Sequence, residues 1–423
     1  MRSFVPKSRF ARDVSVLAGG TAMGQAIALL ASPLLTRLYS PEDFGVLAAY
    51  ASVIGLLGAV VTLRYHLAIP LPETDEEGRT VLILSLLIGV GLSALVAVVV
   101  YVGGARIAQN LKLTPLIPYL WVIPLGLLGL GIYQALNFWA IRQSAFGQIS
   151  RTKFFQGLGM AAGQSVLGFL HGGPLGLLIG DVIGRSSGVT SLAQLAGRDI
   201  RRLGLPKWDG LFRVALRYRQ FPLVSSFSAL LNGAGLQVAP LLMVIYYGPA
   251  VAGLFALAQR LIGIPMTLLG QSVGQVYMAA AAKALHGDPG SVMHLFLRTA
   301  RKLLLIGLAP MLVLAIGGPY LFNLVFGEAW LEAGNFVRIL SGMFLLQFVM
   351  SPLSQTLNIL ECQRAQLFWD ASRLICVFGT LSAAHFLEFS PRMMVGVYSV
   401  AMFACYASLF FIVKSLIRKR ISP

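Results

Sequence analysis

Residues Thr80–Val102 read TVLILSLLIGVGLSALVAVVVYV and contain no charged side chain. An α-helix of about 20 such residues spans the hydrocarbon core of a bilayer, which is about 30 Å thick. The whole chain has a similar composition, because 57% of its 423 residues are hydrophobic and 12% are charged. Soluble domains carry about 25% charged residues. The sequence therefore predicts an all-α polytopic membrane protein, and it excludes a soluble or a disordered chain.

Apolar stretches separated by short polar segments predict about twelve transmembrane helices. We expect two six-helix lobes, an N-lobe over 1–200 and a C-lobe over 221–423, joined by a basic cytoplasmic linker over 201–220. The predicted spans lie near 14–38, 44–68, 80–102, 117–139, 154–171, 174–196, 221–246, 250–280, 303–326, 335–360, 369–389 and 392–414.

The basic residues predict the orientation of the chain. Lys and Arg number 33 against 16 Asp and Glu, which gives a net charge of +17. Most of the basic residues fall in loops that are cytoplasmic if the N-terminus is cytoplasmic, whereas one of these loops, 73–77, is acidic. The positive-inside rule therefore places both termini in the cytoplasm. The charge sets topology and contacts anionic lipid, and no basic stripe interleaved with aromatics predicts nucleic-acid binding.

The two halves contain similar segments. Pro33 precedes Tyr39–Gly45, and Pro240 precedes Tyr247–Gly253. Each pair would form a helix with a late proline, a tight external turn and a second helix. Because each half has an even number of spans, the lobes would be parallel repeats about an axis along the membrane normal, with alternating access between them. Pro33 and Pro240 are candidate hinges, although transmembrane proline often only shapes packing.

Charged residues within the predicted spans are candidates for function. Each costs roughly 2.5–3.5 kcal/mol at a helix centre, so each needs a partner or a water-filled cavity. Asp181 and Arg185 are four residues apart, and Asp370 and Arg373 are three apart. These spacings allow intrahelical ion pairs, which favours a structural role for both pairs.

Four further arginines have no such neighbour. Arg260 lies well inside its span, and no acidic residue occurs within a helical turn of it in the sequence. Arg64, Arg37 and Arg338 lie nearer to span ends, where snorkelling to headgroups is an equal alternative. Guanidinium groups in a lumen with few acids would bind an anion, and their planar geometry suits a diphosphate. The predicted substrate site consists of Arg260, Arg64, Arg37 and Arg338.

The sequence contains no catalytic motif. A nucleophile elbow, a P-loop and an HExxH motif are all missing, so we expect no enzymatic activity and no cofactor. Cys362, Cys376 and Cys405 have no metal-ligand spacing, so we expect no metal site. An exporter of organic cations would need carboxylates in the first and seventh spans, which contain none beyond their extreme ends.

Four segments resemble those of bacterial polysaccharide flippases. They are Tyr39–Gly45, Leu63–Ile69, Ala256–Leu261 and Leu357–Arg364. These proteins, also called Wzx-type or O-antigen flippases, belong to the MATE-like multidrug/oligosaccharidyl-lipid/polysaccharide (MOP) superfamily. The resemblance covers nearly the whole chain in span number and loop length. Members of the family often carry an acidic residue where His66 stands.

The resemblance implies a function in the bacterial inner membrane. The protein would move undecaprenyl-diphosphate-linked oligosaccharide from the cytoplasmic to the periplasmic leaflet for surface polysaccharide or lipopolysaccharide synthesis. Arg260, followed by Leu261 and Pro265 as in a similar segment of the lipid II flippase, would contact the diphosphate together with Arg64. Partners would be the lipid-linked oligosaccharide, membrane lipids and glycan polymerase or ligase machinery.

Three other interpretations of the sequence stay open. The first is a cation- or proton-coupled multidrug or metabolite antiporter of the same fold. The second is a membrane-embedded glycosyltransferase or polymerase, which would be expected to have a large external loop with catalytic acids. The third is a membrane scaffold, which would not explain an arginine at the membrane centre.

Overall fold

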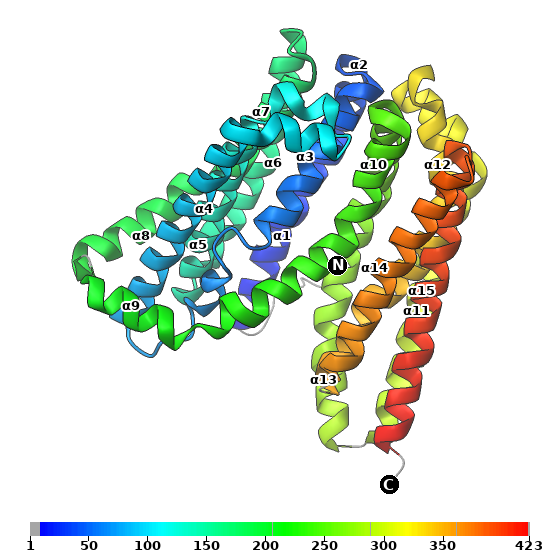
Figure 1. Ribbon diagram of the computed structural model, residues 1–423. Coiled ribbons are helices and arrows are strands. Elements are labelled where there is room, and N and C mark those ends of the chain that lie inside the picture. Colours follow the sequence, from blue (N-terminus) through cyan, green and yellow to red (C-terminus); the bar gives the residue numbers. More distant parts are fainter. Residues whose placement is uncertain (1–8, 205, 288, 361, 422–423) are drawn as a thin grey trace, which may run out of the picture. The chain divides into compact units, whose positions relative to one another are not determined.

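The computed structural model describes residues 9–204, 206–287, 289–360 and 362–421, which form helices joined by turns without any β-strand (Figure 1). The chain forms two compact units, Met1–Gly233 and Ala234–Pro423. Their boundary lies inside a long helix, α10 (Ser226–Gly287). Residues 201–220, predicted to be a linker, belong to the first unit and are largely helical.

The first unit is built from nine α-helices and three shorter helical turns within its described residues. The α-helices are α1 (Arg9–Leu30), α2 (Ser32–Leu38), α3 (Pro41–Gly58), α4 (Asp75–Asn110), α5 (Val122–Arg142), α6 (Phe146–Phe169), α7 (Gly173–Ser186), α8 (Val189–Leu203) and α9 (Trp208–Arg217). The shorter turns are the 3₁₀-helices η1 (Tyr65–Ala68) and η2 (Thr114–Tyr119) and the π-helix η3 (Phe221–Ser225).

The second unit contains most of α10 and the helices that follow it. These are α11 (Pro289–Phe326), the 3₁₀-helix η4 (Glu328–Trp330), α12 (Leu331–Leu353), α13 (Gln355–Ile359), α14 (Gln363–Phe386) and α15 (Pro391–Ile421). Inside α10 the backbone leaves helical geometry at Gly248, where φ is 82°. Glycine adopts this conformation without a steric penalty, so the chain turns there between the predicted seventh and eighth spans.

Eight helical segments among the described residues are long and apolar enough to cross a membrane, which agrees with a polytopic all-α protein. They are Val16–Leu38, Asp75–Asn110, Val122–Arg142, Phe221–Gly270, Ser291–Phe326, Glu328–Ile359, Arg364–Phe386 and Pro391–Lys419. The predicted seventh and eighth spans both fall in Phe221–Gly270. The predicted second, fifth and sixth spans fall on α3, α6 and α7, which are outside this set.

Two predicted spans end earlier than the sequence indicates. The second was expected over 44–68, but α3 ends at Gly58 and a series of turns leads to η1. The sixth was expected over 174–196, but α7 ends at Ser186, and Gly188, at a φ of 72°, starts a separate helix. In both places the apolar composition continues while the backbone turns, so hydropathy alone could not reveal the break.

The repeated segments form similar turns in the two units. In the first, Ser40 and Asp43 form a reciprocal capping box with Pro41 in the first turn of α3. The hydroxyl of Tyr39 donates a hydrogen bond to the carbonyl of Gln164 at 2.6 Å. In the second, the hydroxyl of Tyr247 donates to the carbonyl of Phe389, also at 2.6 Å. Each tyrosine thus holds its turn to a distant segment of its own unit.

The two prolines proposed as hinges occupy different positions. Pro33 lies in the first turn of α2, after the short interruption at Ala31 that separates α1 from α2. Pro240 lies within α10, whose described non-helical residue is Gly248. Neither observation tests motion, so both hinges stay predictions.

Candidate functional site

A cavity lies inside the second unit, next to the residue that carried the substrate prediction. Arg260 lies on α10, is half-buried and has an interaction partner in the structure. Three residues further on the same helix, and so on a neighbouring turn of one face, Gly263 lines a cavity of about 390 Å³. The other described residues that line it are Met266, Gly270, Gly274, Met278, Phe344, Gln347, Phe348, Ser351, Pro352 and Gln355.

Glycines on α10 leave the space that this cavity occupies. A Cβ on Gly263 would have no neighbour within 4 Å, and one on Gly274 would meet Pro352 of α12 at an ordinary 3.5 Å. Side chains at these positions would therefore fill the cavity without forcing the two helices apart. We infer that the small residues matter here for the volume they leave open.

The described residues of the cavity lining are uncharged, and two of them offer amide groups. Gln347 makes no hydrogen bond to the part of the chain that the structure describes. Gln355 accepts a hydrogen bond from the Asn358 amide at 2.9 Å, which leaves its own N–H groups available. Amides beside the rings of Phe344 and Phe348 form an environment that a neutral polar ligand such as a sugar can occupy.

Arg64 lies in a strained turn of the first unit. Leu63 and Arg64 have φ values of 46° and 64°, in the left-handed region. This conformation costs roughly 1–2 kcal/mol per non-glycine residue, and such outliers cluster at functional sites. The Arg64 side chain is half-buried, and its Nε donates to the Ser225 hydroxyl at 3.4 Å.

Buried residues next to Arg64 fix this turn. His66 is buried, forms a hydrogen bond with the Thr62 hydroxyl through Nδ1, and lies 5.0 Å from the Phe138 ring between centroids. The Tyr65 hydroxyl donates to the carbonyl of Ala215 at 3.0 Å. The turn is therefore held both by the core of the unit and by α9.

The other two predicted substrate residues are exposed. Arg37 lies in the last turn of α2, and Arg338 lies on α12. Exposure at these positions fits the alternative of snorkelling to headgroups. Of the four arginines, Arg260 thus lies one helical turn from a residue that lines a cavity, and Arg64 lies in a strained turn.

Both candidate ion pairs are formed. Asp181 accepts hydrogen bonds from Nε and Nη2 of Arg185, at 2.5 and 3.2 Å. Asp370 lies 3.1 Å from Nη2 of Arg373, which is 5% exposed, and the Arg373 guanidinium lies 4.8 Å from the Trp369 ring centroid. Each pair neutralises charge within one helix, which is a structural arrangement.

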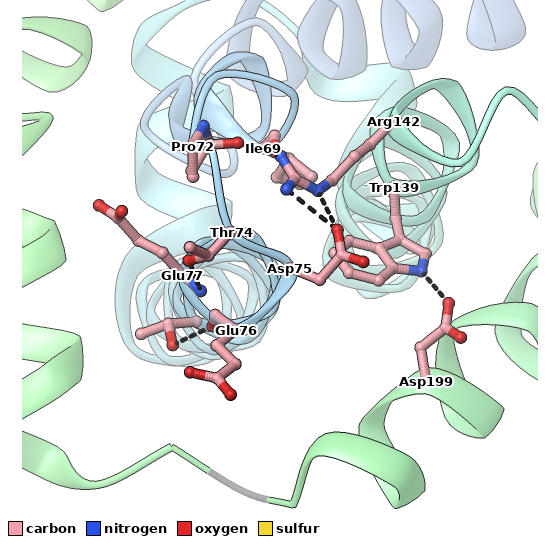
Figure 2. A network of polar contacts seen from close by, with 10 residues as sticks. Ile69, Pro72, Thr74, Asp75, Glu76, Glu77, Trp139, Arg142 and Asp199 are labelled. Atoms are coloured by element: carbon pink, nitrogen blue, oxygen red, sulfur yellow. Dashed lines mark hydrogen bonds and ion pairs between the residues drawn. The ribbon is translucent and has the colours of Figure 1, made fainter.

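A polar network that the sequence did not predict joins α4, α5 and α8. Arg142 donates to Asp75 Oδ1 from Nε and Nη2 at 3.1 and 3.0 Å, and its Nη1 donates to the carbonyl of Pro72 at 2.7 Å (Figure 2). Trp139 Nε1 donates to Asp199 Oδ2 at 3.0 Å. The acidic loop 73–77 was the available signal, because it needs basic partners.

Comparison with known proteins gives the family of the chain. Residues 34–335 match the family described as "Polysaccharide biosynthesis protein". The chain belongs to this family. It is 24% identical to "Teichuronic acid biosynthesis protein TuaB" of Bacillus subtilis (strain 168). The alignment extends over 318 residues, which is 74% of this chain. The chain spans 62% of the length of that relative.

Solved structures of the MOP superfamily share the fold. The inward closed conformation of the lipid II flippase MurJ has a TM-score of 0.72 at 12% identity, over 96% of this chain and 90% of that chain. An inward-facing multidrug resistance MATE family transporter has a TM-score of 0.68 at 14% identity, over 94% of this chain and 95% of that chain. The expected MATE-like fold is therefore confirmed, and this family member is a multi-span membrane protein.

Proposed function

We propose that the protein is a flippase for a lipid-linked saccharide. In this proposal it carries undecaprenyl-diphosphate-linked oligosaccharide from the cytoplasmic to the periplasmic leaflet of a bacterial inner membrane, with both termini cytoplasmic. It performs no covalent chemistry, and it supplies surface polysaccharide, O-antigen or lipopolysaccharide synthesis. Two findings support this proposal: the chain belongs to a family of polysaccharide biosynthesis proteins, and its fold is similar to that of MurJ.

The observation that carries the proposal is the position of Arg260 one helical turn before Gly263, at which a cavity begins whose described lining is uncharged and includes two amides. A guanidinium replaces the hydration of phosphate and keeps its charge at low dielectric. A sugar needs hydrogen-bonding groups and apolar faces, which Gln347 and Phe348 offer. The two features match the two parts of a diphosphate-linked sugar headgroup.

Transport would proceed by alternating access, with the two units as the moving bodies. The polyprenyl chain would stay in lipid while the headgroup passes through the protein. A membrane potential negative inside would favour outward movement of the anionic headgroup, by about 2.3 kcal/mol per charge per 100 mV. Glycan polymerase or ligase machinery would then act on the translocated product.

Transport by reconstituted protein tests the Arg260 assignment. We expect Arg260→Ala to reduce translocation of a fluorescent undecaprenyl-diphosphate saccharide in proteoliposomes at least tenfold, because the diphosphate loses its ligand. Arg418→Ala removes an exposed arginine near the end of α15 and serves as the matched control. Full transport by Arg260→Ala, with fold and insertion unchanged, would contradict this site.

The second candidate function is a cation- or proton-coupled multidrug or metabolite antiporter, which the fold shared with a multidrug resistance MATE transporter favours. The described cavity lining contains no carboxylate that could bind an organic cation. Drug resistance conferred on a sensitive strain, without translocation of the lipid-linked saccharide, would support the antiporter instead.

A further inference from the structure

Helix α9 has two apolar faces, of which only one is covered by protein. Leu211 and Val214 are 8% and 5% exposed and pack inside the first unit. Trp208, Phe212 and Leu216 are 80%, 69% and 52% exposed. They follow one another at intervals of four residues, so they form a single stripe along the helix. This exposed stripe needs an apolar environment that the unit itself does not supply.

Hydrogen bonds fix the depth of α9 and of the end of α8 against α4, beside which α9 lies in Figure 1. Arg217 Nη1 donates to Glu77 Oε1 at 2.7 Å, and Arg79 Nη1 donates to the carbonyl of Gly204 at 2.6 Å. Both α4 residues lie at its start, where the charged first turns give way to the apolar run from Val81. The exposed stripe therefore lies at the level where the membrane begins.

The charges around the stripe are mostly basic. Arg201 and Arg202 of α8 and Arg213 of α9 are exposed and positively charged. Asp209 is the exposed acid of α9. A helix with a tryptophan-containing apolar stripe and flanking basic residues is typical of one that lies in the interface plane of an anionic membrane. The further basic side chains of this segment are Arg198, Lys207, Arg217 and Arg219.

We propose that the α8–α9 segment (Val189–Arg217) docks on anionic phospholipid headgroups. Trp208, Phe212 and Leu216 insert at the boundary between headgroups and acyl chains, and the basic side chains contact lipid phosphates. Docking also bears on the predicted substrate site. Tyr65 directly follows Arg64 in the sequence, and its hydroxyl donates a hydrogen bond to the carbonyl of Ala215 in α9. The lipid-docked segment thereby holds the strained turn that carries Arg64.

Site-directed spin labelling measures this docking in the full chain. The free cysteines Cys362, Cys376 and Cys405 are replaced by serine, and one label is attached through Phe212→Cys or through Glu73→Cys, an exposed position of the acidic loop 73–77. The protein is reconstituted into vesicles of phosphatidylethanolamine and phosphatidylglycerol. We expect relaxation by oxygen, relative to relaxation by a water-soluble nickel chelate, to be several-fold higher at position 212 than at position 73.

Charge variants test the anionic lipid itself. Arg201→Gln/Arg202→Gln/Arg213→Gln should move the label at 212 towards water, as should vesicles of phosphatidylcholine alone. The matched control removes three exposed basic residues of α11, Arg298→Gln/Arg301→Gln/Lys302→Gln, and should leave the label in place.

Three results would overturn the proposal. The first is equal water exposure of the labels at 212 and 73 in anionic vesicles. The second is an equal shift caused by the α11 variant. The third is a label at 212 shielded from both oxygen and nickel, which would indicate a protein partner or a second copy of the chain in place of lipid.

Discussion

Single residues differ in how the protein partners their charges. Asp370 and Arg373 balance each other inside one helix, as the spacing of three residues predicted. Arg64 differs, because its side chain reaches Ser225 and its backbone is held in the left-handed region. The sequence indicated the charge at position 64 and gave no sign of the backbone strain, since leucine and arginine rarely adopt a positive φ.

The strain at Arg64 can be separated from its charge. We expect Arg64→Ala and Arg64→Gly to lose transport to the same extent, because both lack the guanidinium. The free energy of unfolding of the glycine variant should exceed that of the alanine variant by about 1 kcal/mol, since glycine adopts a φ of 64° without the Cβ clash. Denaturant or thermal unfolding of the purified variants measures the difference. Equal stability would mean that the turn relaxes when the side chain is removed.

Whole elements differ most from expectation where an apolar stretch bends. The segment 44–68 divides into α3 and η1, and the segment 174–196 divides at Gly188. Hydropathy measures transfer from water to lipid, which is the same for a continuous and a broken helix. The amphipathic helix α9 was also missed, because its basic residues were interpreted as a linker. Helix α8 was missed because most of it was assigned to the sixth predicted span.

The cavity between α10 and α12 depends on glycines. We expect Gly263→Leu to keep the protein folded, because a Cβ at this position has no neighbour within 4 Å, and to reduce transport several-fold by filling the cavity. Gly342→Leu is a matched control on α12, since Gly342 is exposed, has the same free space and does not line the cavity. Loss of transport in both variants would argue against a role for the cavity.

At the scale of the molecule, the distribution of basic residues predicts the orientation. We expect a fluorescent protein fused after Pro423 to fluoresce in the cytoplasm, and alkaline phosphatase fused there to be inactive, because most basic loops lie on the side of both termini. A phosphatase fusion in the predicted external loop that contains Arg106 and Lys112 should be active. The opposite pattern would place every loop on the other side of the membrane from the one proposed.

The sequence by itself determined the membrane environment, the all-α class and the family, because these depend on composition and on short segments along the chain. It also placed Arg260 in an apolar span and anticipated both ion pairs, since helical spacing fixes neighbours three or four residues apart. Only the tertiary structure decided that Gly263 and Gln347 share a cavity, that Arg64 lies in a strained turn, and that α9 leaves one apolar stripe uncovered. Those features arise from contacts between distant segments, which local patterns of hydropathy and charge do not encode.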